Sequence, residues 1–464
     1  ANTTIDTNAT GNAADITIGA VTSTNINLTL DTTSTTGSAS HTFNGDIRLG
    51  SGGALSVTGD VVLGANIIVV GGGGVTFNND INADNATNND RTLSLSSGQS
   101  STITVTGNVG TSQALAGLTI VQSNQTTFSA SVDVSDSNSG TITLTDTSND
   151  KHIRFEGNLT ADNLTTAAEG YRLFLIGDTT TFTNAVSFQN ADNVALGNEA
   201  GDSLTFNGGL TTTSVSGGGT VFINGTIQTS NDAIVFGAVT LGSNTTIDTN
   251  ATNTTGDITI GAVTGNNNSL TLDTTASTGS ASHTLNGNIN LGTGALSVTG
   301  DVVLGANVSV TATGGIVFND AIDADNASSN DRTLTLDAGT GSAISVTGGI
   351  GGSQALAGLT VSQSNGATFL GAVDVSDSNS GTITLTDTTD SRNIGFNGNV
   401  TADSFVTAAQ GYNLFLNGDT TITNAVTFQN TGTLDLGNTA ADTLTFNGGV
   451  TENTSGTVTI HGAI

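Results

Sequence analysis

Hydrophobic and polar residues alternate along most of the chain, and short glycine and asparagine corners interrupt the alternation. Residues 204–210 read L-T-F-N-G-G-L, in which an apolar residue at every second position precedes an Asn-Gly pair. A period of two is typical of a β-strand with one buried face. Glycine and asparagine tolerate the positive φ that a sharp bend requires. The pattern therefore predicts a strand, a corner and a second strand.

The same strand-and-corner phrase recurs about every 22 residues. It is found, for example, at residues 42–47, 57–61, 77–81, 105–109, 155–159 and 223–227. A repeat of this length built from strands and Gly/Asn corners is typical of a β-solenoid. Sandwiches and barrels also contain short strands and turns, but they rarely repeat one corner phrase throughout. We therefore predict an all-β chain folded as a parallel β-helix.

A longer duplication is superimposed on this repeat. Residues 3–10 return at 245–252, and residues 112–118 return at 353–359. We predict two β-solenoid repeat units, 1–244 and 245–464, of which the second is incomplete at its C-terminal end. Since the ends are out of step with a whole number of repeats, we expect the chain to be a segment of a longer array.

Phenylalanines recur at the last inward position before many corners, so we expect a single internal aromatic column. Its members in the first unit are Phe43, Phe77, Phe128, Phe155, Phe182 and Phe206, and in the second Phe318, Phe369, Phe396 and Phe446. Asn and Thr side chains at the corners are expected to form hydrogen-bonded ladders between turns.

The composition narrows the classes of partner. The chain has no Cys, so it forms no disulfide, and its net charge is −31. Nucleic-acid binding requires a basic surface, and this chain has the opposite. The negative charge also disfavours binding to anionic membranes. The sequence contains no run of about 18 apolar residues, the length that a membrane-spanning helix requires. We predict no nucleic-acid partner and no membrane insertion.

The residues that usually carry catalysis are scarce. The four histidines, His41, His152, His283 and His461, are interpreted as surface or corner residues. Arg91 and its duplicate Arg332 follow Asp90 and Asp331, and a local ion pair accounts for them. Glycoside hydrolysis needs two facing carboxylates, and no such pair can be nominated. We predict that the chain is not an enzyme.

Acidic loops are the best candidates for a ligand site. The candidate Ca²⁺ ligands are Asp133, Asp136 and Asn138, with their duplicates Asp374, Asp377 and Asn379. Hard oxygen ligands at short spacing suit Ca²⁺. Solvated corners are the alternative, because Asp and Asn are abundant throughout the chain. No other cofactor is predicted.

The corner phrases, together with residues 332–339 and 354–359, resemble the large β-strand-repeat surface proteins of bacteria, similar to filamentous haemagglutinin and autotransporter passengers. The resemblance covers the whole chain. It implies a right-handed parallel β-helix, export, and a cell-surface or extracellular location as an adhesin shaft or fibre. It carries over no catalytic residue.

The expected function is therefore structural: a segment of a long extracellular stalk or filament. Its first partner would be itself, in a continuing covalent array or a head-to-tail filament, and a host or neighbouring cell surface is a further candidate. One alternative is a carbohydrate-binding or carbohydrate-cleaving β-helix, for which only Tyr171 and Tyr412 offer a Tyr or Trp ring to sugars. A Ca²⁺-dependent adhesive module is the other alternative.

Overall fold

The computed structural model describes residues 1–7, 14–32, 39–84, 90–136, 139–213, 215, 219–252, 255–275, 281–325, 332–377, 381–453 and 456–464. These residues form β-strands joined by turns and loops, and no helix occurs among them. Contacts divide the chain into two compact units, Ala1–Thr229 (unit 1) and Ser230–Ile464 (unit 2). The duplication boundary at 244/245 falls inside the strand β29 (Val239–Asp248).

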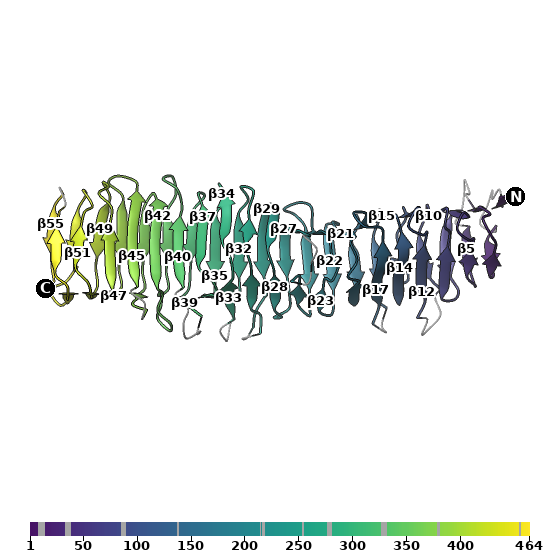
Figure 1. Cartoon of the computed structure of the whole chain (residues 1–464). Coiled ribbons are helices and arrows are strands. Elements are labelled where there is room, and N and C mark those ends of the chain that lie inside the picture. The colour runs from purple at the N-terminus through teal and green to yellow at the C-terminus, as the bar shows by residue number, and fades with distance from the viewer. Residues whose placement is uncertain are drawn as a thin grey trace. The chain divides into compact units, whose positions relative to one another are not determined.

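Each unit is a parallel β-solenoid, in which strands of successive turns lie side by side (Figure 1). Each turn contributes strands to three faces, which we call the first, second and third face in chain order. About 24 residues separate hydrogen-bonded strands of neighbouring turns. The predicted all-β parallel solenoid is confirmed, with a turn slightly longer than the predicted value of about 22 residues.

The strands of unit 1 fall on these three faces. The first face consists of β1 (Thr3–Asp6), β4 (Leu28–Asp31), β7 (Ala54–Thr58), β10 (Gly74–Phe77), β13 (Thr102–Val105), β15 (Gln125–Phe128), β18 (His152–Phe155), β21 (Arg172–Leu175), β24 (Val194–Leu196) and the start of β27 (Val221–Gln228). The second consists of β2 (Ile16–Ile18), β5 (Ser40–Phe43), β8 (Asp60–Leu63), β11 (Ile81–Ala83), β16 (Val132–Val134), β19 (Leu159–Ala161), β22 (Thr179–Phe182), β25 (Ser203–Phe206) and the end of β27. The third consists of β3 (Val21–Thr22), β6 (Ile47–Arg48), β9 (Ile67–Val70), β12 (Thr92–Ser96), β14 (Gly117–Ser123), β17 (Thr141–Thr147), β20 (Asn163–Thr166), β23 (Val186–Ser187) and β26 (Leu210–Thr211).

Unit 2 repeats this arrangement, and its faces are named by the sequence correspondence of its strands with those of unit 1. Its first face consists of the end of β29, then β32 (Leu270–Asp273), β35 (Leu296–Thr299), β38 (Ile316–Phe318), β41 (Ile344–Val346), β43 (Ala367–Phe369), β46 (Asn393–Phe396), β49 (Asn413–Leu416), β52 (Leu434–Leu436) and β55 (Val458–Ile460). The second consists of β28 (Ile234–Phe236), β30 (Ile258–Ile260), β33 (Ser282–Leu285), β36 (Asp301–Leu304), β39 (Ile322–Ala324), β44 (Val373–Val375), β47 (Val400–Ala402), β50 (Thr420–Ile422) and β53 (Leu444–Phe446). The third consists of the start of β29, then β31 (Val263–Thr264), β34 (Ile289–Gly292), β37 (Val308–Ala312), β40 (Thr333–Asp337), β42 (Gly358–Ser364), β45 (Thr382–Thr388), β48 (Ser404–Thr407), β51 (Val426–Phe428) and β54 (Val450–Glu452).

The alternation read from the sequence separates the interior from the surface. On β17, for example, Ile142 and Leu144 are fully buried, while Thr141 and Thr143 lie on the outer side. The parallel register places each inward residue next to an inward residue of the next turn, as in Leu118↔Ile142. The interior is therefore a continuous apolar core within each unit, and burial of this surface is the main favourable term in folding.

The predicted single aromatic column is wrong. In unit 1 the first face carries Phe77, Phe128 and Phe155 in register with Val57 and Val105. The second face carries the other three, of which Phe182 and Phe206 are paired. The corner phrase occurs both after first-face strands and after second-face strands, so the pattern alone cannot assign a phenylalanine to a face. Rings in register stack closely, with centroids 4.9 Å apart for Phe128 and Phe155.

The corners of successive turns also stack, which explains their composition. A Cβ on Gly157 would lie 2.3 Å from the Ala130 carbonyl carbon of the previous turn. No side chain fits at such a distance. Corner asparagines bond along the stack: Asn184 Nδ2 donates to Asn163 Oδ1 at 3.0 Å, and Asn417 Nδ2 donates to Asn397 Oδ1 at 2.7 Å. These bonds join the corners of neighbouring turns, the single steps of which the predicted ladders would consist.

Replacing one stacked phenylalanine tests the core assignment. We expect Phe128→Ala to lower the free energy of unfolding by about 3–5 kcal/mol, because it removes a fully buried ring and leaves a cavity. The matched control is Thr127→Ala on the outer side of the same strand, for which a change under about 0.5 kcal/mol is expected. Guanidinium unfolding followed by circular dichroism measures both. Equal effects of the two variants would contradict the assignment.

Candidate functional site

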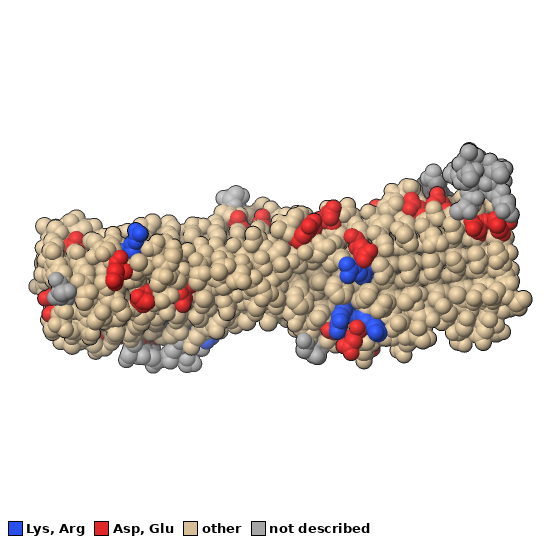
Figure 2. All heavy atoms as spheres, turned by 90° about the horizontal axis from the view of Figure 1, so that it is seen from above, with Lys and Arg blue, Asp and Glu red and all other residues tan. Residues whose placement is uncertain are grey.

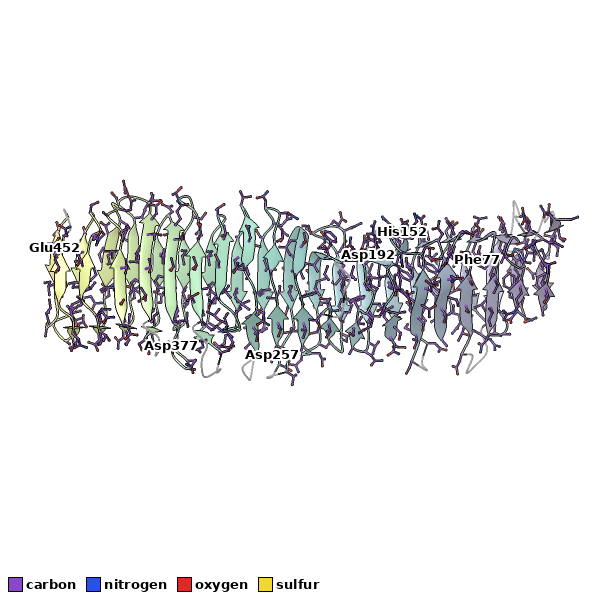
Figure 3. The ribbon with its side chains drawn as sticks, in the orientation of Figure 1. Phe77, His152, Asp192, Asp257, Asp377 and Glu452 are labelled. Carbon is purple, nitrogen blue, oxygen red and sulfur yellow. The ribbon has the colours of Figure 1, made fainter. Side chains whose placement is uncertain are left out.

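The acidic loops predicted to bind Ca²⁺ follow the second-face strands β16 and β44. Asp133 Oδ1 accepts a hydrogen bond from the Ser135 amide at 3.0 Å, and Asp374 Oδ1 accepts the same bond from Ser376. Asp133 is the middle residue of β16, and Asp136 lies in the loop that follows this strand. Figure 3 shows Asp377 at the edge of unit 2 where the loops lie.

One carboxylate oxygen of each loop thus stabilises a local turn. Asn138 and Asn379, the third members of the two sets, lie outside the described residues. Ca²⁺ binding at these loops stays a prediction.

Two of the four histidines are core residues, contrary to their interpretation as surface or corner residues. His41 is fully buried, and its Nε2 donates to the Thr58 carbonyl at 2.9 Å and lies 3.2 Å from the Thr32 hydroxyl. His283 repeats this arrangement with Thr299 and Thr274, at 2.9 and 3.1 Å.

Burial lowers the pKa of both imidazoles, although hydrogen bonding to a backbone carbonyl and nearby carboxylates act in the opposite direction. The remaining nitrogen, Nδ1, has no hydrogen-bond partner among the described residues in either copy. Each cluster therefore holds its histidine in the core of the solenoid, with Nε2 bonded to a backbone carbonyl and next to a threonine hydroxyl.

The other two histidines are not duplicated. The His152 ring meets Phe174 edge-on, with centroids 6.0 Å apart, and burial followed by the Arg154 charge lowers its pKa. His461 Nε2 lies 3.5 Å from Asp435 Oδ1. The structure brings neither histidine together with a serine nucleophile and an aspartate in the contacts of the described residues.

The two tyrosines are unsuited to sugar stacking. Tyr171 and Tyr412 are fully buried, and their hydroxyls donate to the carbonyls of Leu144 and Leu385 at 3.3 and 3.4 Å. Desolvation raises the pKa of both phenols far above its usual value. The aromatic groups on which a sugar-binding interpretation depended are therefore part of the core.

A more open aromatic group was missed by sequence reasoning. Phe415 lies on the outer side of β49, in a shallow hollow lined also by Asn393, Asn397 and Asn417. On the neighbouring strand its partner in register is Gly395, which has no side chain to cover the ring.

At the equivalent place in unit 1, Arg154 is in register with Phe174 and lies over its ring, with the guanidinium carbon 5.7 Å from the centroid. Arg154 in the first copy corresponds to Gly395 in the second, and this difference in the sequence could have indicated the exposed ring of Phe415.

Basic residues are mostly paired with acids. Arg91 contacts Asp84 through two bonds of 2.8 and 2.9 Å, and Arg332 contacts Asp325 through bonds of 2.7 and 2.9 Å. On the face seen in Figure 2, Lys and Arg atoms lie beside Asp and Glu atoms, and most of the surface is uncharged. Both arginines therefore form local ion pairs, but the partners shown are Asp84 and Asp325, seven residues earlier, and not the adjacent Asp90 and Asp331 that the sequence interpretation named. Asp331 lies outside the described residues.

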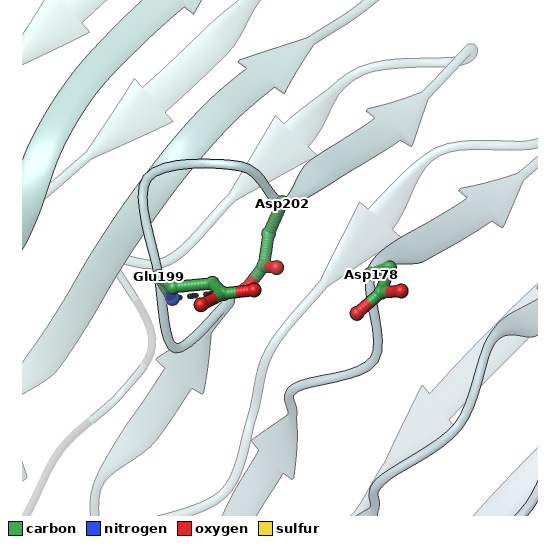
Figure 4. A group of neighbouring side chains, drawn as sticks. All are labelled: Asp178, Glu199 and Asp202. Carbon is green, nitrogen blue, oxygen red and sulfur yellow. Dashed lines mark hydrogen bonds between the residues drawn. The ribbon is translucent and has the colours of Figure 1, made fainter.

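Three carboxylates of unit 1 meet at one corner (Figure 4). Asp178 lies between β21 and β22, and Glu199 and Asp202 lie one turn later, between β24 and β25. One oxygen from each lies within 4.8 Å of the others. Glu199 was not among the candidate ligands predicted from the sequence, although the second copy has Thr439 at the equivalent position and this difference marks the corner.

No protein-family model, curated protein or solved structure matches this chain in the three comparisons made. Within the described part of the chain, no helix is long and apolar enough to cross a membrane.

The buried histidines predict a pH-dependent stability. Their folded-state pKa is lowered, so below about pH 6.5 the unfolded chain binds more protons than the folded chain. Stability is therefore lost as the pH falls through this value, by at most about 1.4 kcal/mol per pH unit for each histidine. We expect the double variant His41→Gln with His283→Gln to flatten this decline.

Denaturant midpoints measured from about pH 7.5 to about pH 5 test this expectation, because histidines titrate in that range while most carboxylates titrate lower. His461→Gln, at a side chain 46% exposed, is the control. An unchanged slope in the double variant would show that the two buried histidines do not cause the decline.

Proposed function

We propose that the chain is a structural segment of a long extracellular stalk or filament, an adhesin shaft that holds other parts away from a cell. The observation that carries this proposal is the stacking of parallel turns around an apolar core in both units. In such an architecture each turn depends only on its neighbours, so length is gained by adding turns.

The chemistry of the stack suits an exported protein without disulfides. Each turn bonds to the next through backbone groups and through corner side chains, as in the bonds that Asn108 Oδ1 and Asn193 Oδ1 accept from the Ser131 and Thr220 amides. Many small contacts thus replace covalent cross-links. The net charge of −31 favours repulsion between neighbouring fibres and keeps them soluble.

The proposed partners follow from the same features. The first is the protein itself, in a covalent array or a head-to-tail filament, because the end of a parallel solenoid offers unpaired backbone groups for pairing. A host or neighbouring cell surface is the second. The absence of a catalytic role is part of the proposal, since the paired histidines and both tyrosines are core residues.

Carbohydrate binding is the second candidate, favoured by the hollow at Phe415. An aromatic side chain flanked by amide side chains suits a sugar, because the sugar ring can pack on the aromatic ring while the sugar hydroxyls form hydrogen bonds with the amides. The hollow is shallow and is lined mostly by small polar side chains beside a single aromatic ring, so this function ranks below the structural one.

Localisation tests the structural proposal. Antibodies raised against the chain are expected to label filaments outside intact cells of the source organism by immunogold electron microscopy. Cells in which the gene is deleted provide the control and should show neither label nor filaments. Label confined to the cell interior would contradict the proposal.

Binding to immobilised glycans tests the second candidate. If the hollow binds a sugar, Phe415→Ala should weaken binding by about fivefold to thirtyfold, which corresponds to the ~1–2 kcal/mol of a lost aromatic contact. Gly395→Arg, which copies the arginine of unit 1, should also block it. Phe174→Ala in unit 1 is the matched control. Wild-type protein that binds no glycan would remove this candidate.

A further inference from the structure

We propose that Asp178, Glu199 and Asp202 form a binding site for one divalent cation, and that this cation is Ca²⁺. The proposal is independent of the stalk function, because it rests only on one corner of unit 1 (Figure 4). Three observations carry it: the geometry of the loops, a buried carboxylate oxygen without a partner, and the corresponding corner of unit 2.

The loop of residues 197–202 is built around Asp202. Its Oδ2 accepts hydrogen bonds from the amides of Asn198 and Glu199, at 2.6 and 3.1 Å. Gly197 starts the loop with a positive φ of 75°, which a residue with a side chain adopts only with strain. These contacts fix the carboxylate of Asp202 and place Glu199 directly beside it.

The loop of the previous turn supplies the third carboxylate. The Asp178 carbonyl accepts a hydrogen bond from the Ser203 amide at 2.9 Å, so the two loops are joined by the same backbone bonding that joins the strands. Asp178 and Glu199 are exposed to solvent. A cation and its water ligands can therefore enter from the solvent side.

The second carboxylate oxygen of Asp202 is buried and lacks a hydrogen-bond partner among the described residues, as expected for a ligand of an ion. The residue is only 1% exposed, and its Oδ1 has no hydrogen-bond partner among the described residues. Figure 4 shows this carboxylate directed into the space shared with Asp178 and Glu199. An uncompensated buried carboxylate oxygen is costly, and two further carboxylates close by increase the cost.

No basic side chain compensates this charge: none of the ion pairs found within the described ranges includes these three residues. A bound cation would neutralise all three carboxylates at once. Carboxylate oxygens are hard ligands, and Ca²⁺ accepts six to eight of them in flexible geometry, with water completing the set.

Unit 2 contains the same loop without the site. Asp442 Oδ2 accepts bonds from the Asn438 and Thr439 amides, at 2.7 and 2.8 Å. Here the residue equivalent to Glu199 is Thr439, whose hydroxyl donates to Asp442 Oδ1 at 3.0 Å. Hydrogen bonds from this loop lower the pKa of Asp442.

The remaining aspartate of that corner, Asp419, accepts a bond from the Thr443 amide at 2.7 Å. The corner of unit 2 is thus satisfied by protein groups alone. Replacing the threonine by glutamate, as in unit 1, removes the hydroxyl donor and adds a charge. The lost hydroxyl donor and the added charge both favour a bound cation at the corner of unit 1.

Calorimetric titration of the whole chain with CaCl₂ tests the proposal. The protein is first treated with EDTA and exchanged into metal-free buffer of about 0.15 M salt, which screens non-specific binding to its many acidic groups. We expect one site per chain with a Kd on the order of 10⁻⁴ M or tighter. Mg²⁺ at the same concentration should compete only weakly, because it prefers rigid octahedral sites.

The decisive variant is Glu199→Thr, which copies the loop of unit 2 and is expected to fold. It should weaken Ca²⁺ binding at least about tenfold. In EDTA it should raise the melting temperature, because the new hydroxyl satisfies Asp202 Oδ1. The matched control is Glu169→Gln, which copies Gln410 of unit 2, removes the same charge outside the corner, and should leave Ca²⁺ affinity unchanged.

Two results would overturn the proposal: wild-type protein that binds no Ca²⁺ under these conditions, or equal Ca²⁺ affinity in the Glu199→Thr and Glu169→Gln variants. If Mg²⁺ bound to the site with the same affinity as Ca²⁺, the assignment of the ion as Ca²⁺ would be overturned. Asp178→Asn provides an independent check, since loss of the ligand on the neighbouring turn should weaken binding without disturbing the 197–202 loop.

Discussion

The parallel hydrogen bonding between successive turns is the constraint on which each unit depends. It satisfies the backbone of strands that lie between two turns, and it fixes the register, so that inward residues meet inward residues from turn to turn. A slip by one residue would expose a whole row of Val, Ile, Leu and Phe side chains. The apolar core, the stacked corners and the position of every loop follow from that register.

The fold was predictable because its signals are local and repeated. Alternation defined the strands, and Gly and Asn defined the corners, since a Cβ at Gly157 would collide with the turn below. The assignment of phenylalanines to faces failed, because the same phrase ends strands on two faces. Which face a strand occupies depends on the length of the loop before it, and that length varies from turn to turn.

The site chemistry was less predictable. A histidine in a polar Ser-His-Thr context gave no sign that it lies in the core, because its partners Thr32 and Thr58 come from other positions of the chain. The acidic corner joins Asp178 to residues one turn later. Neither spacing forms a recognisable motif. The useful signal lay in the differences between the duplicated copies. Glu199 of unit 1 corresponds to Thr439 of unit 2, and Arg154 beside Phe174 in unit 1 corresponds to Gly395 beside Phe415 in unit 2.

The stacking of each turn on the one before it has a consequence for how the protein folds. Strands that pair between neighbouring turns are separated by about 20–30 residues, so each unit consists of contacts that are close in the sequence. Low contact order favours rapid folding, and nearest-neighbour stacking lets structure grow from any nucleus. A chain that emerges from one end can therefore fold progressively, each new turn using the last completed one as its template. The addition of each turn to the folded end releases free energy, and this release would favour movement of the remaining unfolded chain toward the folded end.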